Sequence, residues 1–197
     1  MIRLKYNFHI LLIIILLGSS CNNRFQVNLS DIDKTKISIG RYEQDLFSQE
    51  LSEERIDTLQ KDYPLFLGDT PLDSISMQRL KSYVTDPFLM KVYEEIENVF
   101  PNVSEQEENL STAFRFIKYY DPKFEYPIVY TYLSGTQDEP YYQDQIVMIS
   151  LDRFLGQGNE LYHMIGISKY KQNAMQKSYF TREVLKAIAY HYIPPVS

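Results

Sequence analysis

Two histidines are the residues through which the main part of this chain could hold a metal ion or move a proton. The sequence has three histidines: His9 lies in an apolar N-terminal stretch, and His163 and His191 lie far beyond it. A catalytic zinc site needs about three protein ligands, so His163 and His191 would have to converge with carboxylates from elsewhere. We expect packing or surface roles for both histidines, with a metal site as the alternative.

Two groups of glutamates resemble the paired acids of acid–base catalysis. They are Glu94, Glu95 and Glu97, and then Glu105, Glu107 and Glu108. Each group falls on the polar face of a predicted helix whose opposite face is apolar, so we expect solvated surface rather than catalysis. No serine stands in a G-x-S-x-G turn and no glycine-rich loop follows a predicted strand, so neither a serine hydrolase nor a nucleotide-binding protein is specifically supported.

Tyrosines are concentrated between residues 119 and 142. They are Tyr119, Tyr120, Tyr126, Tyr130, Tyr132, Tyr141 and Tyr142. Such rings could stack on a sugar or a peptide, but aromatic residues in and beside strands more often pack against a core. Core and sheet packing is therefore the expected role, and ligand stacking is the alternative.

An acidic and a basic residue, Asp152 and Arg153, directly follow an apolar run that reads as a strand. Continued strand alternation would send the two side chains to opposite faces. We expect Asp152 to be inward and structural, bonded to backbone N–H groups of the 156–158 loop or paired with Arg41. We expect Arg153 to be exposed.

The elements that must position these residues predict an α+β fold. Residues 127–133 and about 145–151 are rich in β-branched and aromatic side chains, which predicts two central strands of a mixed or antiparallel sheet. Both strands are apolar on both alternating faces, so we expect cover on each side. The roughly dozen residues between them are too few for a crossover helix, which favours antiparallel pairing of the two strands.

Capping residues and apolar stripes predict helices on both sides of the strands. Four predicted helices precede the strands and two follow them; they begin at Ser52, Ser74, Asp86, Ser104, Asn159 and Thr181. Ser104 would open a capping box, and the helix that follows should close at Asp121–Pro122. The last helix should turn its apolar residues inward, namely Val184, Leu185, Ile188 and Ala189. Residues 37–197 are thus expected to form a single α+β domain.

Composition and charge exclude several classes of protein. The chain has 197 residues, 44% of them hydrophobic, and a formal net charge of −6. The densest basic cluster is Lys169–Lys171, which argues against nucleic acid as a partner. The only cysteine is Cys21, which excludes an intramolecular disulfide and a cysteine-based zinc site. No cofactor is indicated.

The N-terminus has the pattern of a signal peptide. Arg3 and Lys5 precede the apolar stretch 8–17, and Gly18, Ser19 and Ser20 follow it. This stretch is shorter than the about 20 residues of a membrane-spanning helix. The sequence from Leu17 to Cys21 resembles the lipobox of bacterial lipoproteins, which implies that residues 1–20 are removed and that Cys21 receives lipid such as palmitate. Residues 21–36 are largely polar and are expected to be a tether.

Short motifs along the rest of the chain resemble the gliding-motility lipoprotein B family (GldB-like) of Bacteroidetes. They are Arg41-Tyr42-x-x-Asp45-Leu46-Phe47, Tyr63–Phe66, Phe116–Tyr120 with Phe124 and Pro127, Leu133–Gly135, and Leu151–Gly156. The resemblance implies a membrane-anchored accessory protein of the cell envelope, linked to gliding and to the associated secretion machinery.

That family is in turn similar to zinc metallopeptidases that carry H-E-x-x-H on a helix. Aligned on His191, the required His and Glu positions hold Ala187 and Ile188, so a ligand and the general base are both missing. A third ligand would lie beyond Ser197, and we expect a C-terminally truncated or shortened form.

These observations together predict a degenerate metallopeptidase-like domain without peptidase activity. We expect a lipoprotein anchored to the inner or outer membrane through Cys21, facing the periplasm and acting on other envelope proteins. The alternatives are a zinc-dependent peptidase-like hydrolase with unrecognised ligands and a carbohydrate- or peptide-binding lipoprotein.

Overall fold

The computed structural model describes residues 34–135 and 138–193. The predicted signal peptide, Cys21 and nearly all of the tether lie outside the described residues. From Thr35 onward the chain forms one compact unit. Within the described part, no helix has both the length and the apolar character needed to cross a membrane.

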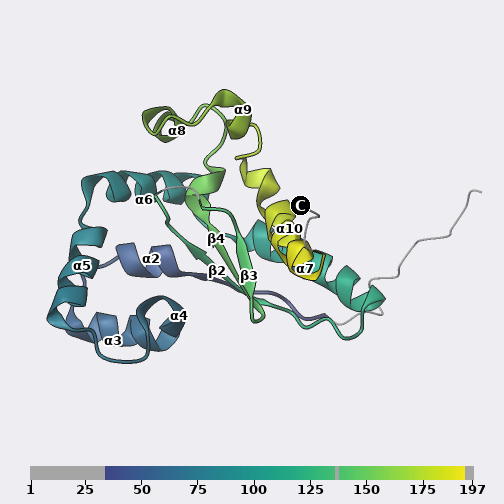
Figure 1. Ribbon diagram of the computed structural model, residues 1–197, viewed down its shortest axis with the longest axis horizontal. Helices are drawn as coiled ribbons and strands as arrows, with labels where there is room; N and C mark the ends of the chain where they lie inside the picture. Colours follow the sequence, from purple (N-terminus) through teal and green to yellow (C-terminus); the bar gives the residue numbers. More distant parts are fainter. Residues whose placement is uncertain (1–33, 136–137, 194–197) are drawn as a thin grey trace, which may run out of the picture. The chain divides into compact units, whose positions relative to one another are not determined.

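A four-stranded mixed sheet forms the centre of this unit (Figure 1). In spatial order the strands are β1 (Ile39–Arg41), β2 (Ile128–Tyr132), β4 (Ile146–Ser150) and β3 (Tyr141–Gln143). β1, β2 and β4 are parallel, and β3 is antiparallel to β4. The α+β class, the mixed sheet and the two central strands, β2 and β4, are confirmed.

The predicted antiparallel pairing of the two central strands is wrong. β2 and β4 run parallel, with Ile128 opposite Ile146 and Tyr132 opposite Ser150. The connection from β2 to β4 runs through a loop and then through β3, which pairs with β4 on the side away from β2. The described residues of this connection therefore contain no crossover helix. Asp144 and Gln145 then reverse the chain with φ values of 50° and 63°, the left-handed conformations that suit a tight two-residue hairpin turn.

The two faces of the sheet are covered unequally, contrary to the expectation of full cover on each side. Val129 and Thr131 of β2 are fully buried, whereas Ile128 is exposed and Tyr130 is half-buried. On the second face the cover is aromatic, since the Tyr130 ring lies edge-on to both Tyr63 and Phe66. Burial along β2 therefore alternates between the two faces, although its composition is apolar on both, because the second face is only partly covered.

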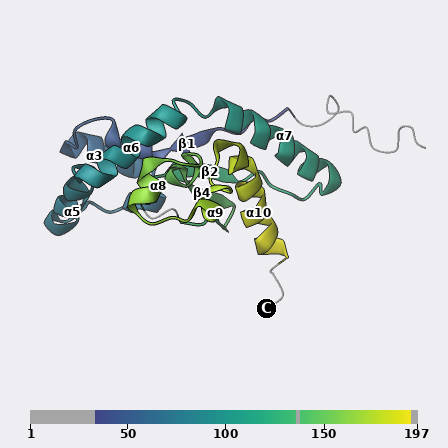
Figure 2. The same ribbon diagram turned by 90° about the horizontal axis from the view of Figure 1, so that it is seen from above.

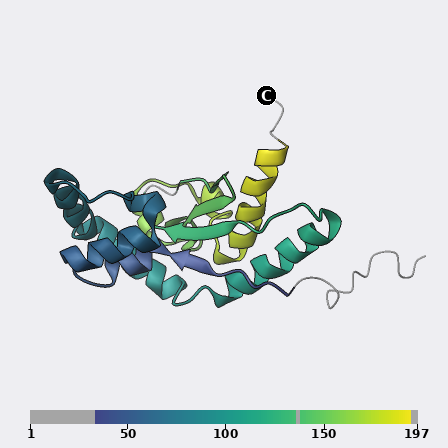
Figure 3. The same cartoon turned by 90° about the horizontal axis from the view of Figure 1, so that it is seen from below.

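Among the described residues, six helices precede β2 and frame the sheet. They are α2 (Tyr42–Phe47), α3 (Glu53–Asp62), α4 (Pro64–Leu67), α5 (Ser74–Val84), α6 (Pro87–Val99) and α7 (Ser104–Tyr120). Figures 2 and 3 show α3 and α5 toward one end of the sheet and α7 with α10 toward the other. The predicted caps at Ser52 and Asp86 are confirmed, as is the end of α7 before Pro122.

The helices predicted at Ser74 and Ser104 begin at those residues, but neither serine caps its helix. The cap of α5 is Asp73, whose carboxylate accepts from the N–H of Ser76. The capping box at Ser104 does not form, because Ser104 is the first residue of α7 and its N–H donates to the side chain of Asn102. In both cases an equally good acceptor stands one or two residues earlier in the sequence.

The C-terminal part adds short helices and one long helix. After β4 come η3 (Leu151–Phe154), α8 (Glu160–Met164), α9 (Lys169–Gln172), η4 (Lys177–Tyr179) and α10 (Phe180–Tyr192). The predicted Asn159 cap is confirmed, whereas the predicted start of the last helix at Thr181 is wrong, since α10 begins at Phe180 with Tyr179 at the cap position. The buried residues of α10 are Phe180, Glu183, Val184 and Ile188. Leu185 is only half-buried and Ala189 is exposed, because the inward stripe repeats at four-residue spacing from Phe180.

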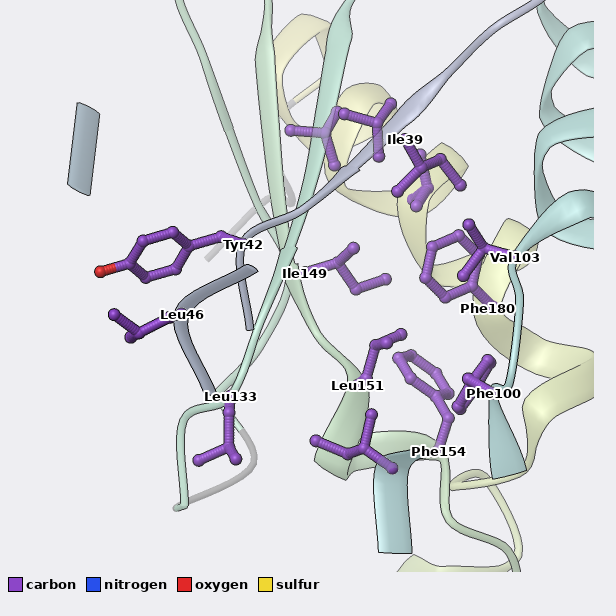
Figure 4. Packing of buried hydrophobic residues seen from close by; sticks show 14 of the residues in the cluster. Ile39, Tyr42, Leu46, Phe100, Val103, Leu133, Ile149, Leu151, Phe154 and Phe180 are labelled. Carbon is purple, nitrogen blue, oxygen red and sulfur yellow. The ribbon is translucent and has the colours of Figure 1, made fainter. Parts of the chain in front are cut away.

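The hydrophobic core lies between the sheet and the helices that contact it (Figure 4). Ile149, Leu151 and Phe154 approach it from β4 and η3, and Phe100 and Phe180 approach from α6 and α10. The Phe154 and Phe180 rings meet edge-on at 5.7 Å between centroids. Residues far apart in sequence are thereby fixed around the carboxyl end of β4.

Buried tyrosines predict a loss of stability at alkaline pH. Burial is the largest cause that raises the pKa of seven hydroxyls, those of Tyr42, Tyr63, Tyr83, Tyr93, Tyr132, Tyr142 and Tyr162. The pKa rises to about 12 for Tyr83 and Tyr142, against about 10 in an unfolded chain. A pKa raised on folding gives stability that is complete below the unfolded value and lost as pH rises through the folded value.

The melting temperature should therefore hold up to about pH 10 and fall steeply above it. Tyrosinate absorbance and circular dichroism followed over the same pH series should change together. Full titration of the tyrosines near pH 10 with an unchanged melting temperature would contradict this prediction.

Candidate functional site

A buried polar network around Arg41 joins the first strand to the core. The Nε of Arg41 donates to Glu43 at 2.8 Å, Nη1 donates to the carbonyl of Phe100 at 2.8 Å, and Nη2 donates to Glu97 at 2.7 Å. The hydroxyl of Thr131 donates to the second oxygen of Glu43 at 2.8 Å. The network thus connects β1 and α2 to the C-terminal end of α6 and to β2.

Glu43 is fully buried, and both of its carboxylate oxygens accept hydrogen bonds. Burial raises the pKa of Glu43, and the charge of Arg41 and the hydrogen bond from Thr131 oppose that rise. A general base must reach a substrate within hydrogen-bond distance. Glu43 has no exposed surface through which a substrate could approach, so the network acts as a structural clamp.

Asp152 is the second buried carboxylate, and its predicted inward position is confirmed at 2% exposure. Its predicted partners are wrong. It accepts from the N–H and the hydroxyl of Ser134, at 3.0 and 2.9 Å, whereas Gly156 and Gly158 donate their N–H groups to Met175 and Gln172. Strand alternation stops at Ser150, where η3 begins, and Asp152 reaches the segment that follows the neighbouring parallel strand β2.

Arg153 was predicted to be exposed, and this is wrong. Its side chain is only 14% exposed, and Nη2 donates to Glu139 at 2.7 Å. The same 3-10 turn explains the error, because it changes the direction of both side chains at the end of β4.

The glutamate groups are less uniformly solvated than predicted. Glu94, Glu105 and Glu108 are exposed, as expected. Glu97 belongs to the Arg41 network, and Glu95 accepts from the side-chain amide of Asn159 at 2.9 Å. Glu107 accepts from the N–H of Ile39 at 2.9 Å. This last bond satisfies a backbone donor of the edge strand β1, so α7 occupies the place of a further strand.

The two histidines lie on different helices and both are exposed. His163 lies on α8, and the ring of His191 on α10 packs edge-on against Tyr142 at 5.0 Å between centroids. Within residues 34–135 and 138–193 there is no group of three or more His, Cys, Asp or Glu residues that could hold a metal ion. Ile188, at the position of the general base in the metallopeptidase pattern, points into the core.

We predict that the full-length protein, purified in detergent and dialysed, contains far less than one zinc ion per chain. A catalytic zinc needs about three converging ligands, and His163 and His191 stand on separate helices. Elemental analysis measures the metal content directly. About one zinc per chain, lost in His191→Ala together with peptide hydrolysis, would contradict the prediction.

The tyrosines divide between packing and exposure. Tyr142 is buried, and Tyr126, Tyr130 and Tyr132 are half-buried, in agreement with a packing role. Tyr119 and Tyr120 are exposed at the end of α7, where their rings meet edge-on at 5.1 Å, and Tyr141 is exposed on β3. The structure therefore does not gather the tyrosines of residues 119–142 into a single face.

An open cleft of about 580 Å³ lies between η3, α9 and the start of α10. Its charged lining residues are Arg153, Lys171, Arg182 and Glu139, and Tyr170 and Tyr179 flank them. Sequence reasoning did not single out Lys171 or Arg182 as site residues. The available signal was charge, because residues 161–197 hold five Lys or Arg and one Glu in a chain of net charge −6.

These features define a class, an α+β domain that follows a lipoprotein-type N-terminus and whose buried carboxylates Glu43 and Asp152 are bonded to neighbouring residues. Residues 22–197 match the family described as Gliding motility protein GldB, and the chain belongs to that family. The match begins at the residue after Cys21. As a lipoprotein family, it implies a lipid-anchored protein of the cell envelope. No curated protein and no solved structure matches the chain.

Proposed function

We propose that this protein is a non-catalytic accessory component of the cell envelope that takes part in gliding motility and acts through contacts with other envelope proteins. Membership of the GldB family over residues 22–197 is the observation that carries the proposal. Acylation of Cys21 would hold it at the membrane, since each buried methylene contributes about 0.8 kcal/mol and several chains give a lasting anchor.

The disposition of the polar groups favours a role without catalysis. Glu43 and Asp152 are buried and bonded to neighbouring residues, and His163 and His191 belong to separate helices. An active site needs a nucleophile or base beside a group that orients it, facing a place for substrate. The metallopeptidase-like ancestry remains a proposal that rests on the similarity of the family to zinc metallopeptidases.

A zinc-dependent hydrolase and a sugar- or peptide-binding lipoprotein are the competing functions. The first requires His163 or His191 for activity, and the second requires an exposed aromatic surface such as Tyr119 with Tyr120. Both groups are exposed, so substitutions there can test function with little effect on folding.

The test is rescue of a deletion strain by variants of the full-length gene. The His163→Ala/His191→Ala double variant should restore gliding and secretion as fully as the wild type does. A Tyr119→Ala/Tyr120→Ala variant serves as the matched test of the binding alternative. If the histidine variant is folded and present at the membrane but fails to rescue, the non-catalytic proposal is refuted.

A further inference from the structure

We propose that the cleft between η3, α9 and α10 binds a carboxylate-rich segment of a partner protein, and that Glu139 occupies part of this site as an internal competitor. This inference rests on the proposed function, because it gives the chemistry of one of the protein contacts. Figure 1 shows α9 close to the start of α10.

Three elements each contribute one cation to the cleft. Arg153 comes from η3, Lys171 from α9 and Arg182 from α10. Residues 161–197 carry a net charge of +4, so the rest of the chain carries −10. The cleft lining itself holds three cations and one carboxylate, a net charge of +2 in a chain of net charge −6, so a negatively charged segment would be attracted to the cleft more than to the remaining surface.

Glu139 already places a carboxylate in this site. It lies 2.7 Å from Nη2 of Arg153, and Glu139 is 68% exposed whereas Arg153 is only 14% exposed. The surrounding structure thus fixes the guanidinium of Arg153, whereas the exposed carboxylate of Glu139 is fixed mainly by its ion pair with that guanidinium. Ion pairs with an exposed member contribute little to stability, so a partner's carboxylate can replace Glu139 at small cost.

The other two cations retain capacity for a ligand. The guanidinium of Arg182 lies over the Tyr179 ring at 3.9 Å, and its Nε and Nη2 donate to Glu183. Among the described residues, the hydrogen bonds of Arg182 use Nε and Nη2 and leave Nη1 for a ligand, and Lys171 makes no ion pair. The stacking and the Glu183 contact fix the plane of Arg182, which suits recognition of a planar carboxylate.

The size and the lining of the cleft favour a peptide segment over a single anion. A volume of about 580 Å³ lies within the range of about 300–1,000 Å³ that is usual for organic ligands. Tyr170, at 86% exposure, stands beside the cations, and tyrosine is a frequent anchor for protein partners. A long polyanion such as nucleic acid would meet the acidic remainder of the chain and be repelled.

Fluorescence anisotropy with the full-length protein in detergent tests the inference. The probe is a short labelled peptide in which glutamate and tyrosine alternate, and the control peptide has glutamine in place of glutamate. Only the glutamate peptide should bind, and its affinity should fall as salt is added. Inorganic phosphate and mixed micelles of the detergent with anionic phospholipid are the competitors that stand for a free anion and a lipid surface.

Three variants should change the affinity, one upward and two downward, and a fourth variant is the control. Glu139→Gln should tighten binding by roughly three- to fivefold, because the internal competitor is removed. Lys171→Gln and Arg182→Gln should each weaken it by roughly three- to tenfold. Lys123→Gln removes the same charge from an exposed residue outside the cleft lining and should leave the affinity unchanged.

Specific results would overturn the inference. Equal binding of the glutamine peptide, or unchanged affinity in both Lys171→Gln and Arg182→Gln, would refute the peptide site. Unchanged or weaker binding in Glu139→Gln would refute the internal competitor. Displacement of the peptide by phosphate or by anionic phospholipid in mixed micelles, at concentrations equal to that of the peptide, would refute the peptide site in favour of a general anion site. None of these outcomes bears on rescue of the deletion strain, so failure here is distinct from failure of the proposed function.

Discussion

Arg41→Ala is expected to lower the free energy of unfolding by about 3–5 kcal/mol, because it leaves a buried carboxylate without its counter-charge. Glu43 is fully buried, and one of its two oxygens depends on the Nε of Arg41. The variant also removes the donors to Glu97 and to the carbonyl of Phe100. Chemical denaturation of wild type and variant at neutral pH measures the difference.

A matched surface variant and a double variant show whether the loss comes from the buried charge. Arg79→Ala removes an exposed arginine of α5 and should change the free energy of unfolding by no more than about 0.5 kcal/mol. Arg41→Met/Glu43→Leu removes both charges together and should lose less stability than Arg41→Ala. A loss below about 1 kcal/mol in Arg41→Ala would contradict the clamp, since it would lie in the range of exposed ion pairs.

Cys21→Ala is expected to abolish membrane attachment of the mature protein. Cys21 is the only cysteine and therefore the only thiol that could be acylated. Without acyl chains, the variant should either leave the membrane fraction or accumulate as an uncleaved precursor. Metabolic labelling with a fatty-acid analogue, followed by membrane fractionation, gives both readouts.

Ser20→Ala is the control for this prediction. It changes the residue before the cleavage point to one that is commoner in lipoboxes, so labelling and membrane attachment should be preserved. Continued labelling and membrane retention of Cys21→Ala would show that the chain is attached in another way.

Local sequence signals predicted much of the helical part of the fold. Ser52, Asp86 and Asn159 were identified as caps because a capping side chain bonds to a backbone N–H only two or three residues away. Local signals of this kind could not predict that β2 and β4 pair in parallel. It depends on β3, a three-residue strand that carries the chain past β4 and has little periodicity of its own.

The polar contacts were harder to predict because their partners are distant in sequence. Glu43 and Thr131 are separated by 88 positions, and Arg41 and Glu97 by 56. Arg41 entered only through a family motif and as one possible partner of Asp152. Charged residues within an otherwise apolar stretch were the available signal, since buried charges are found paired.

The central claim is that the protein works at the envelope through protein contacts, and site-specific crosslinking in its own cells tests it most directly. A photo-crosslinking residue placed at Tyr170, beside the cleft, should capture defined envelope proteins of the motility apparatus. The same residue in the Cys21→Ala background should capture far less of them. If the rescuing, membrane-bound protein yields no protein crosslinks from Tyr170 or from the exposed sites Tyr119 and Tyr141, the account is contradicted.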